Sequence, residues 1–204
     1  MYQNPFVKLE AAETKELLEE VRPYIEGGSF TPENTVMLAQ DFGFYPGYRF
    51  LDIANYESTP SQHRYVIYKD EDIVVLDWTN EKIYALNDRL PIKLDENNVI
   101  DYVRFFFNYV RGKQGRFIIV ENVDDINWRE EPPPAARKAI GQMLEPVSLF
   151  TREDNGVFHL VACVIFRDSL FKSKIEVKTN GIVSLYDEEL IVEDMPIAED
   201  TLGL

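Results

Sequence analysis

Few side chains of this sequence could act as a nucleophile, a general base or a soft metal ligand. His63 and His159 are its only histidines, and Cys163 is its only cysteine. In an extended strand His159 and Cys163 would share a face but lie roughly 13 Å apart, which is too far for a thiolate–imidazole pair. The sequence also lacks a G-x-S-x-G elbow, a P-loop and a G-x-G-x-x-G turn. It therefore shows no recognisable catalytic site, and the balance favours a protein that is not an enzyme.

Metal and cofactor sites are not indicated either. Neither histidine stands at ligand spacing from another nitrogen or sulfur ligand. The acidic runs 70–72 and 124–125 could hold a weakly bound divalent ion, but neither matches the calcium-loop pattern. Aspartate is common in turns because its side chain bonds to the local backbone. We expect these acids to be solvated turn residues, and we expect no bound metal or cofactor.

Positive charge gathers at one place in this acidic chain, in and just before the loop 112–116. The basic residues there are Arg104, Arg111, Lys113 and Arg116. One interpretation is a contact for an anion or for an acidic partner. The other is that Arg111 and Lys113 complement the negative end of the preceding helix, where cations are expected on that ground alone.

A second cluster is aromatic. The loop 42–50 contains five Phe or Tyr residues together with two Gly and one Pro. If they are exposed, Phe44, Tyr45 and Tyr48 would form a contact surface, because aromatic residues concentrate at interface cores. If they are buried, they would pin the N-terminal helices to the sheet. Trp78, beside a predicted hairpin turn, is a further candidate for a partner contact.

Periodicity and turn residues predict the elements that position these side chains. A helix is predicted over 13–25 from its apolar face, and a second over 31–40, which Thr31 and Pro32 would open. Short strands joined as hairpins are predicted over 49–53, 64–69, 73–77 and 82–86.

The clearest predicted element is a long aromatic helix over about 96–111. Asp95 can cap its start and Gly112 can end it. A helix this aromatic needs a large apolar partner, which favours a sheet. The remaining predicted elements are a strand over 116–121, a helix over 135–144, and strands over 147–151, 157–167, 170–178, 182–186 and 189–193.

This order of elements indicates an α+β fold with mostly antiparallel sheet in two β-meanders. Two stretches, Tyr65–Leu90 and Cys163–Leu190, also resemble each other in their Val-Ile-aromatic-basic-Asp start and their Thr-Asn turn. One interpretation is a distant internal repeat. The other is convergence, because strands and turns draw on few residue types.

The segment 122–134 is the best candidate for a linker. It combines acids with three consecutive prolines, which favour an extended chain. It would divide an N-terminal half, 1–121, from a C-terminal half, 135–204, unless both pack as a single domain. Trp128 within it could act as a clasp between the halves, and the acidic end from about Glu193 is expected to fray.

The stretch 73–111 (IVVLDWTNEKIYALND, then a capped helix with YVRFFFNYVR) resembles the strand–turn–strand–helix layout of SUKH-family proteins. Many of those are immunity proteins that neutralise toxins. The resemblance covers about a fifth of the chain and rests on the order of elements. It implies a protein that acts by binding another protein, and it assigns no role to any single residue.

Charge limits the classes of partner. The net charge is −15, from 36 acidic and 21 basic residues, which disfavours nucleic acid and anionic membranes. One interpretation is that this negative charge attracts a basic partner and speeds its association. The other is that it only keeps the protein in solution. No apolar run approaches the ~20 residues needed to span a membrane, and the start lacks a secretory signal. We therefore expect a cytoplasmic protein.

These features together favour a non-enzymatic module that binds another protein, with a basic partner and an immunity-like mode as one form of it. The rival hypothesis is a small-molecule-binding protein or an unfamiliar enzyme with a pocket between the two β-meanders. Its candidate ionisable groups are His63, His159 and Asp101.

Overall fold

The computed structural model describes residues 5–90 and 92–200. These residues form four α-helices and two five-stranded antiparallel sheets, which confirms the predicted α+β class. Residue contacts divide the chain into two units, Met1–Asp77 and Trp78–Leu204, and each contains one of the sheets. The predicted linker at 122–134 lies inside the second unit. The division into independently folding halves stays a prediction.

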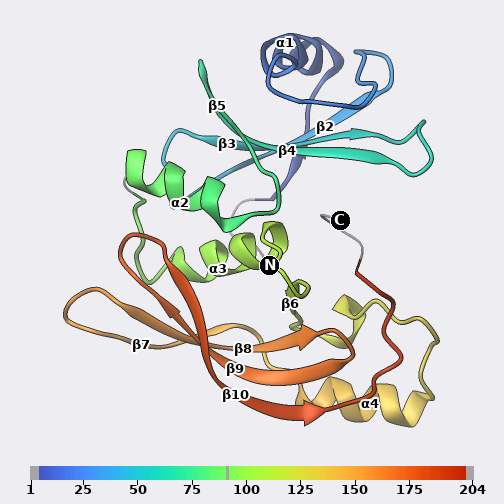
Figure 1. Ribbon diagram of the computed structural model, residues 1–204, viewed down its shortest axis with the longest axis vertical. Coiled ribbons are helices and arrows are strands. Elements are labelled where there is room, and N and C mark those ends of the chain that lie inside the picture. Colours follow the sequence, from blue (N-terminus) through green and yellow to red (C-terminus); the bar gives the residue numbers. More distant parts are fainter. Residues whose placement is uncertain (1–4, 91, 201–204) are drawn as a thin grey trace. The chain divides into compact units, whose positions relative to one another are not determined.

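The first unit is a β-meander with a helix on one face (Figure 1). Its strands pair in chain order and are β1 (Val7–Lys8), β2 (Thr35–Asp41), β3 (Arg49–Asn55), β4 (Gln62–Lys69) and β5 (Asp72–Val75). Helix α1 (Ala11–Val21) buries Leu17, Leu18 and Val21 in an apolar cluster with residues of this sheet. It ends just ahead of Pro23, which cannot continue a helix without strain.

The segment predicted as a helix over 31–40 is mainly the strand β2, so that prediction is wrong. A single turn does form at its start, where the Thr35 amide donates to the Thr31 carbonyl at 3.1 Å. Beyond that turn Thr35, Met37 and Ala39 are buried and alternate with less buried residues, which is the period of a strand. The Thr-Pro signal therefore specifies one turn only, and the alternation makes the rest of the segment a strand.

The second unit contains the other sheet and the remaining helices. The helices are α2 (Asn80–Arg89), α3 (Val99–Tyr109), a short 3-10 turn η1 (Val123–Asp125) and α4 (Pro134–Met143). The strands are β6 (Phe117–Ile119), β7 (Ser148–Arg152), β8 (Phe158–Phe166), β9 (Ser169–Val177) and β10 (Val183–Val192). They pair in the order β10-β9-β8-β6, with β7 also on β8. Figure 1 shows α3 and α4 on opposite sides of this sheet.

The segment predicted as a strand over 82–86 is helix α2, which corrects that expectation. Ile83, Leu86 and Asn87 are buried on it at spacings of three and four residues, as on one face of a helix. Consequently the two similar stretches differ in structure: the first folds as β4, β5 and α2, whereas the second folds as β8, β9 and β10. The correspondence stops after the first hairpin, which favours convergence over an internal repeat.

Two predicted strands near the C-terminus, 182–186 and 189–193, are one strand, β10. Its pairing with β9 shifts register at Tyr186/Glu188 and at Leu190/Val192. Between the first pair, Asp187 has a φ of 51°. A bulge with one residue in the left-handed region lets the strand continue between the two predicted ranges, because Asp tolerates that conformation better than most residues.

Helix α3 is shorter than the predicted helix over about 96–111. Asp95 does not cap it directly, but its Oδ1 accepts from the amides of Asn97 at 2.8 Å and Asn98 at 3.1 Å. These bonds form the turn that leads into the helix. The helix then ends at Tyr109, three residues before Gly112.

A buried hydrogen-bonded cluster joins both helices α2 and α3 to the β9–β10 turn. The Tyr102 hydroxyl donates to the Gly181 carbonyl at 2.6 Å and accepts from Asn87 Nδ2 at 3.2 Å. Tyr102 is fully buried, and that burial raises the pKa of its phenol. Gly181 has a φ of 78°, and a Cβ there would lie 2.7 Å from the Tyr102 hydroxyl. The turn therefore needs glycine for its backbone conformation and for the close approach.

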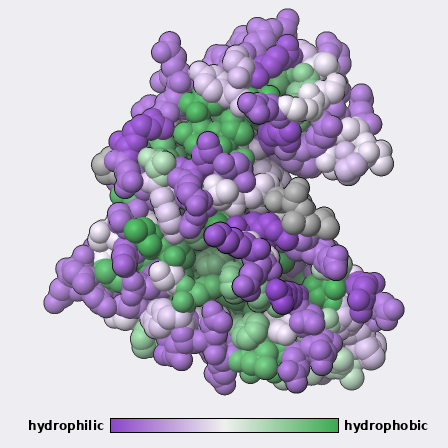
Figure 2. Space-filling model, in the orientation of Figure 1, coloured by the Kyte–Doolittle hydropathy of each residue, from purple (hydrophilic) through white to green (hydrophobic). Residues whose placement is uncertain are grey.

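Hydrophilic side chains, purple in Figure 2, cover much of the face in view of each unit. Several large apolar side chains of the described residues are also exposed. They are Val7, Tyr24, Tyr56, Met143, Phe150, Tyr186 and Leu190.

Tyr102→Phe should lower the free energy of unfolding by about 1–3 kcal/mol, because it removes the hydroxyl that contacts a buried carbonyl and a buried amide. Urea unfolding followed by circular dichroism measures the change. Tyr24→Phe is the matched control, since Tyr24 is half-exposed, and it should alter stability by less than about 0.5 kcal/mol. Equal effects of the two substitutions would contradict the role assigned to Tyr102.

Candidate functional site

Four arginines line one cleft of about 690 Å³ in the second unit. Arg111 and Arg116 come from the loop between α3 and β6, Arg129 from the segment after η1, and Arg167 from the β8–β9 turn. The C-terminal segment 194–200 forms another wall. Three stretches that are distant in the sequence thus bring guanidinium groups to one place.

Asp200 links the two arginines of the α3–β6 loop. Arg116 Nε donates to Asp200 Oδ2 at 2.8 Å, and Arg111 Nη1 donates to the Asp200 carbonyl at 3.0 Å. All three side chains are less than a fifth exposed. Charge-assisted bonds in a half-buried setting are stronger than those on an open surface. The loop and the C-terminal segment are therefore held together at this point.

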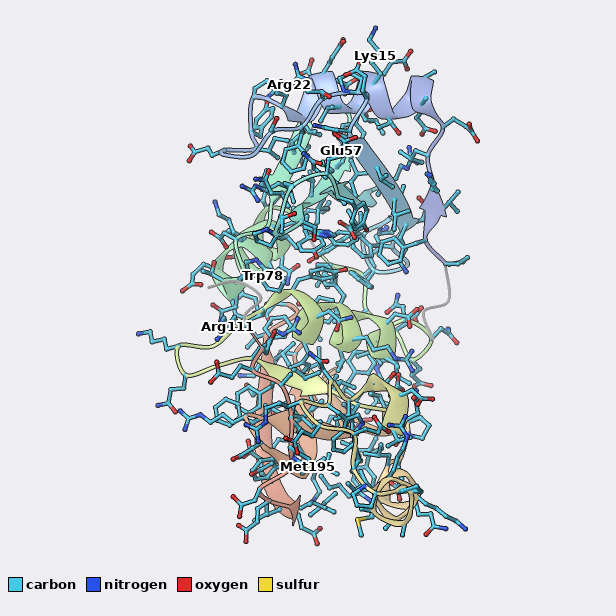
Figure 3. The ribbon with its side chains drawn as sticks, turned by 90° about the vertical axis from the view of Figure 1, so that its right-hand side faces the viewer. Lys15, Arg22, Glu57, Trp78, Arg111 and Met195 are labelled. Carbon is cyan, nitrogen blue, oxygen red and sulfur yellow. The ribbon has the colours of Figure 1, made fainter. Side chains whose placement is uncertain are left out.

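Trp78 and the basic loop were separate predictions from the sequence, and the structure brings them together. The Arg111 amide donates to the Trp78 carbonyl at 2.7 Å, and the Arg116 guanidinium lies 5.7 Å from the Trp78 ring centroid. Figure 3 shows Trp78 and Arg111 near each other. Trp78 is half-buried and precedes helix α2, so it does not stand beside a hairpin turn as predicted.

Arg129 and Arg167 are both exposed on the cleft. Within residues 5–90 and 92–200, neither guanidinium has a carboxylate within ion-pair distance, and Arg167 lies over the Phe166 ring at 5.4 Å. Sequence reasoning missed both because each is an isolated arginine. Only the fold places them beside the basic loop, and no local signal could have found them.

The cleft also carries four carboxylates: Asp168, Asp194, Glu199 and Asp200. Asp200 is engaged by two arginines, and Asp168 accepts a hydrogen bond from the Ser169 hydroxyl at 3.1 Å. The lining is thus of mixed sign. Its outer arginines, Arg129 and Arg167, are the groups best placed to meet an anion.

The C-terminal segment is not a frayed tail, which corrects that expectation. The Met195 amide donates to the Asp168 carbonyl, and the Ala198 amide donates to the Asn127 carbonyl, each at 2.8 Å. Met195, labelled in Figure 3, is buried in an apolar cluster. Trp128 packs on the same cluster, which contains residues from both sides of the predicted linker. The residues 201–204 lie outside the described residues.

The other two predicted cationic residues do not line the cleft. Arg104 makes two bonds to Glu121, at 2.7 and 3.0 Å, and one to Asp101 at 3.1 Å. Arg104 is therefore held by two carboxylates of the structure, Glu121 and Asp101, and these bonds account for its guanidinium. Lys113 is exposed, and the described residues show no ion pair for it.

The aromatic loop is interior in this structure. Phe44, Tyr45 and Tyr48 are all buried. The Phe44 and Tyr45 rings lie 5.0 Å apart between centroids, and the Tyr48 hydroxyl donates to Asp72 Oδ2 at 2.6 Å. Of the two interpretations that the sequence left open, this burial supports the second, in which these side chains are part of the packing. A partner contact at these residues stays a prediction.

Each histidine lies between two polar partners. His159 has Nε2 at 2.7 Å from Glu153 and Nδ1 at 2.9 Å from the Tyr186 hydroxyl. His63 has Nδ1 beside Asp52 and Nε2 beside a serine hydroxyl. The sequence named both histidines as candidates but could not name these partners, which come from neighbouring strands and turns.

Cys163 is buried, and that burial raises the pKa of its thiol. Such a thiol is a packing residue rather than a reactive one. Among the residues that the structure describes, no three His, Cys, Asp or Glu side chains are grouped to hold a metal ion. No helix in the described ranges is both long enough and apolar enough to cross a bilayer.

Comparisons with protein-family models, with curated proteins and with solved structures find no match to this chain. The residues that suggested a SUKH-like layout fold as β5, α2 and α3. The second predicted strand of that layout is thus a helix, and the structure does not contain the order of elements on which the resemblance rested.

The Arg104–Glu121 pair should stabilise the protein at neutral pH. Burial alone would raise the pKa of Glu121, but the bonds from Arg104 and from the Val147 amide outweigh it and hold that pKa below its usual value of 4.5. A lowered folded-state pKa contributes stability above about pH 4.5 that is lost as the pH falls below it. Glu121→Gln should therefore cost about 1–3 kcal/mol at pH 7.

Urea unfolding at several pH values measures this effect. The difference between the wild type and Glu121→Gln should shrink as the pH falls below 4.5. Glu130→Gln is the control, because Glu130 is exposed. A difference that stays constant down to acid pH would show that the charge of Glu121 does not matter.

Proposed function

We propose that the protein acts by binding, and that its arginine-lined cleft takes a small ligand with carboxylate or phosphate groups. The observation that carries this proposal is the convergence of four arginines on one cleft of a chain with net charge −15. A cleft of about 690 Å³ is also within the size range of small-molecule sites.

The chemistry of guanidinium groups supports an anionic ligand. Arginine presents donors in a fixed planar fork that matches carboxylate and phosphate oxygens. Within the cleft, Arg116 already donates from Nε to the Asp200 carboxylate, and Arg111 donates to the Asp200 backbone carbonyl. A ligand would engage the exposed pair Arg129 and Arg167, for which the described residues show no carboxylate partner.

The cleft lies elsewhere than the pocket expected for a small-molecule-binding protein. The expected pocket lay between the two β-meanders, whereas every residue that lines this cleft belongs to the second unit. Its walls are loops at the end of one sheet together with the C-terminal segment.

Isothermal titration with citrate and with inorganic phosphate tests the proposal. The wild type should bind at least one of them, and the double variant Arg129→Gln/Arg167→Gln should bind it at least about 10-fold more weakly, because each charge-assisted bond contributes about 1.5–3 kcal/mol. Titration rather than thermal shift is needed, since phosphate and other excluded anions raise the stability of most proteins without a site.

Arg152→Gln is the matched control for charge removal. Arg152 is exposed, lies on β7 and does not line the cleft, so its substitution should leave the affinity unchanged. Equal affinities in the wild type and the double variant, or no binding of either anion, would contradict the proposal.

A second candidate function is the binding of a basic protein partner, in the immunity-like mode expected from the sequence. One observation favours it: β10 is an edge strand of its sheet in the described residues, and it exposes three consecutive acids, Asp187, Glu188 and Glu189. Tyr186 and Leu190 are exposed beside them. An acidic surface with apolar groups suits a basic partner, although the two register shifts in β10 make direct strand addition unfavourable.

Affinity capture from a lysate of the native host, at low and at high salt, tests this second function. A specific partner that is retained at low salt, released at high salt and lost with Glu188→Lys would support it. A partner that binds equally to Glu188→Lys would place the contact elsewhere.

A further inference from the structure

Three side chains of the first unit form a hydrogen-bonded series that the proposed binding function does not use. His63 Nδ1 lies 3.1 Å from Asp52 Oδ1, and His63 Nε2 lies 3.4 Å from Ser61 Oγ. When Nδ1 carries the ring proton and donates it to Asp52, Nε2 is an acceptor that faces a hydroxyl. Hydroxyl, base and orienting acid then stand in the order that a serine nucleophile requires.

Strand register explains why these groups meet. Asp52 on β3 pairs with Tyr65 on β4, and Ala54 pairs with His63. Asp52 and His63 are therefore diagonal neighbours on one face of the sheet. Ser61 precedes His63 by two residues and lies directly before β4, where the extended chain brings its side chain to the same face as His63.

The imidazole of His63 is held in place by its neighbours. The Tyr56 ring meets it edge-on with centroids 5.5 Å apart, and the Tyr65 ring stacks on it at 6.1 Å. The Asp52 side chain is only 18% exposed. Its burial raises the pKa of the carboxyl, while the bond from His63 acts in the opposite direction. Because two rings and one half-buried acid already fix the imidazole, little conformational entropy is lost when it orients for proton transfer.

Ser61 is exposed, so a substrate can reach its hydroxyl. The neighbouring Ser58 is different, because its Oγ lies 3.1 Å from the Asn55 carbonyl and 3.0 Å from the Pro60 carbonyl. Its proton is thus directed to the backbone. Both serines belong to the stretch just after Glu57, which Figure 3 labels.

We propose that Ser61 is a nucleophile and that this site hydrolyses small carboxylic esters. Ser61 Oγ attacks the carbonyl carbon while His63 Nε2 takes the hydroxyl proton. The tetrahedral adduct then breaks its bond to the alcohol oxygen, and the alcohol leaves with the proton from His63. Water adds to the acyl-serine by the same proton route and releases the acid. One ester and one water thus give one acid and one alcohol.

Asp52 does not touch the substrate in this scheme and is a positioning residue. Its carboxylate fixes the ring so that Nε2 faces Ser61, and it stabilises the imidazolium that forms during proton transfer. A carboxylate is needed for the second task, whereas an amide of the same shape would satisfy a purely structural role.

The test uses the full-length protein and p-nitrophenyl acetate, with acetyl groups located by mass spectrometry of the digested protein. Ser61 should be acetylated roughly 100-fold faster than Ser58, since a positioned general base contributes about 10²–10⁴-fold. Ser61→Ala and His63→Gln should abolish the fast acetylation and the burst of p-nitrophenolate, and Ser58→Ala should keep both. Equal acetylation of the two serines, or an unchanged rate in His63→Gln, would overturn the proposal.

A comparison of two Asp52 variants separates positioning from structure. Asp52→Glu keeps the charge and should retain more of the acetylation rate of Ser61 than Asp52→Asn, which keeps the shape. The opposite ranking would show that Asp52 only packs. Ser61→Ala changes an exposed residue, so the proposal stays testable even if a His63 or Asp52 variant fails to fold.

Discussion

The second unit depends on the burial of the aromatic face of α3. Tyr102, Phe105 and Phe106 are buried on that helix, and burying such rings is a large favourable term in folding. It also carries the Tyr102 hydroxyl into the interior, where a polar group must find partners. The Gly181 carbonyl and Asn87 supply them, so one constraint fixes both helices α2 and α3 and the β9–β10 turn.

The candidate cleft is a consequence of how the chain continues after α3. The helix ends at Tyr109, and the next loop carries Arg111 and Arg116 to the edge of the sheet. There Asp200 holds both arginines and fixes the C-terminal segment beside them. Two ionised groups that compensate each other can be half-buried, whereas the exposed Arg129 and Arg167 remain solvated and open to a ligand. Electrostatics thus explains why Arg111 and Arg116 have a structural role while Arg129 and Arg167 are available to a ligand.

The sequence predicted most of the fold, and its errors have identifiable causes. The fold class, α1, α3, α4 and most strands could be predicted, because apolar residues recur at the helix or strand period in many of them and prolines flank α4. The predictions for 31–40 and 82–86 were wrong. In the first, a local helix-start signal outweighed the alternation of a strand, and in the second a short apolar pattern outweighed the helical spacing of the buried residues. β-propensity and capping are weak where tertiary packing decides.

The sites were harder to predict because they depend on residues that are distant in sequence. Arg111, Arg116 and Trp78 could be named from local patterns, but Arg129, Arg167 and Asp200 join them only through the fold.

Anion binding by the cleft can be observed residue by residue in an NMR titration with citrate that follows the side-chain Nε–H resonances of the arginines. We expect Arg129 and Arg167 to shift and saturate together while Arg152 stays unchanged. Shifts confined to arginines outside the cleft, or spread evenly over all of them, would contradict the assignment of the cleft as the binding site.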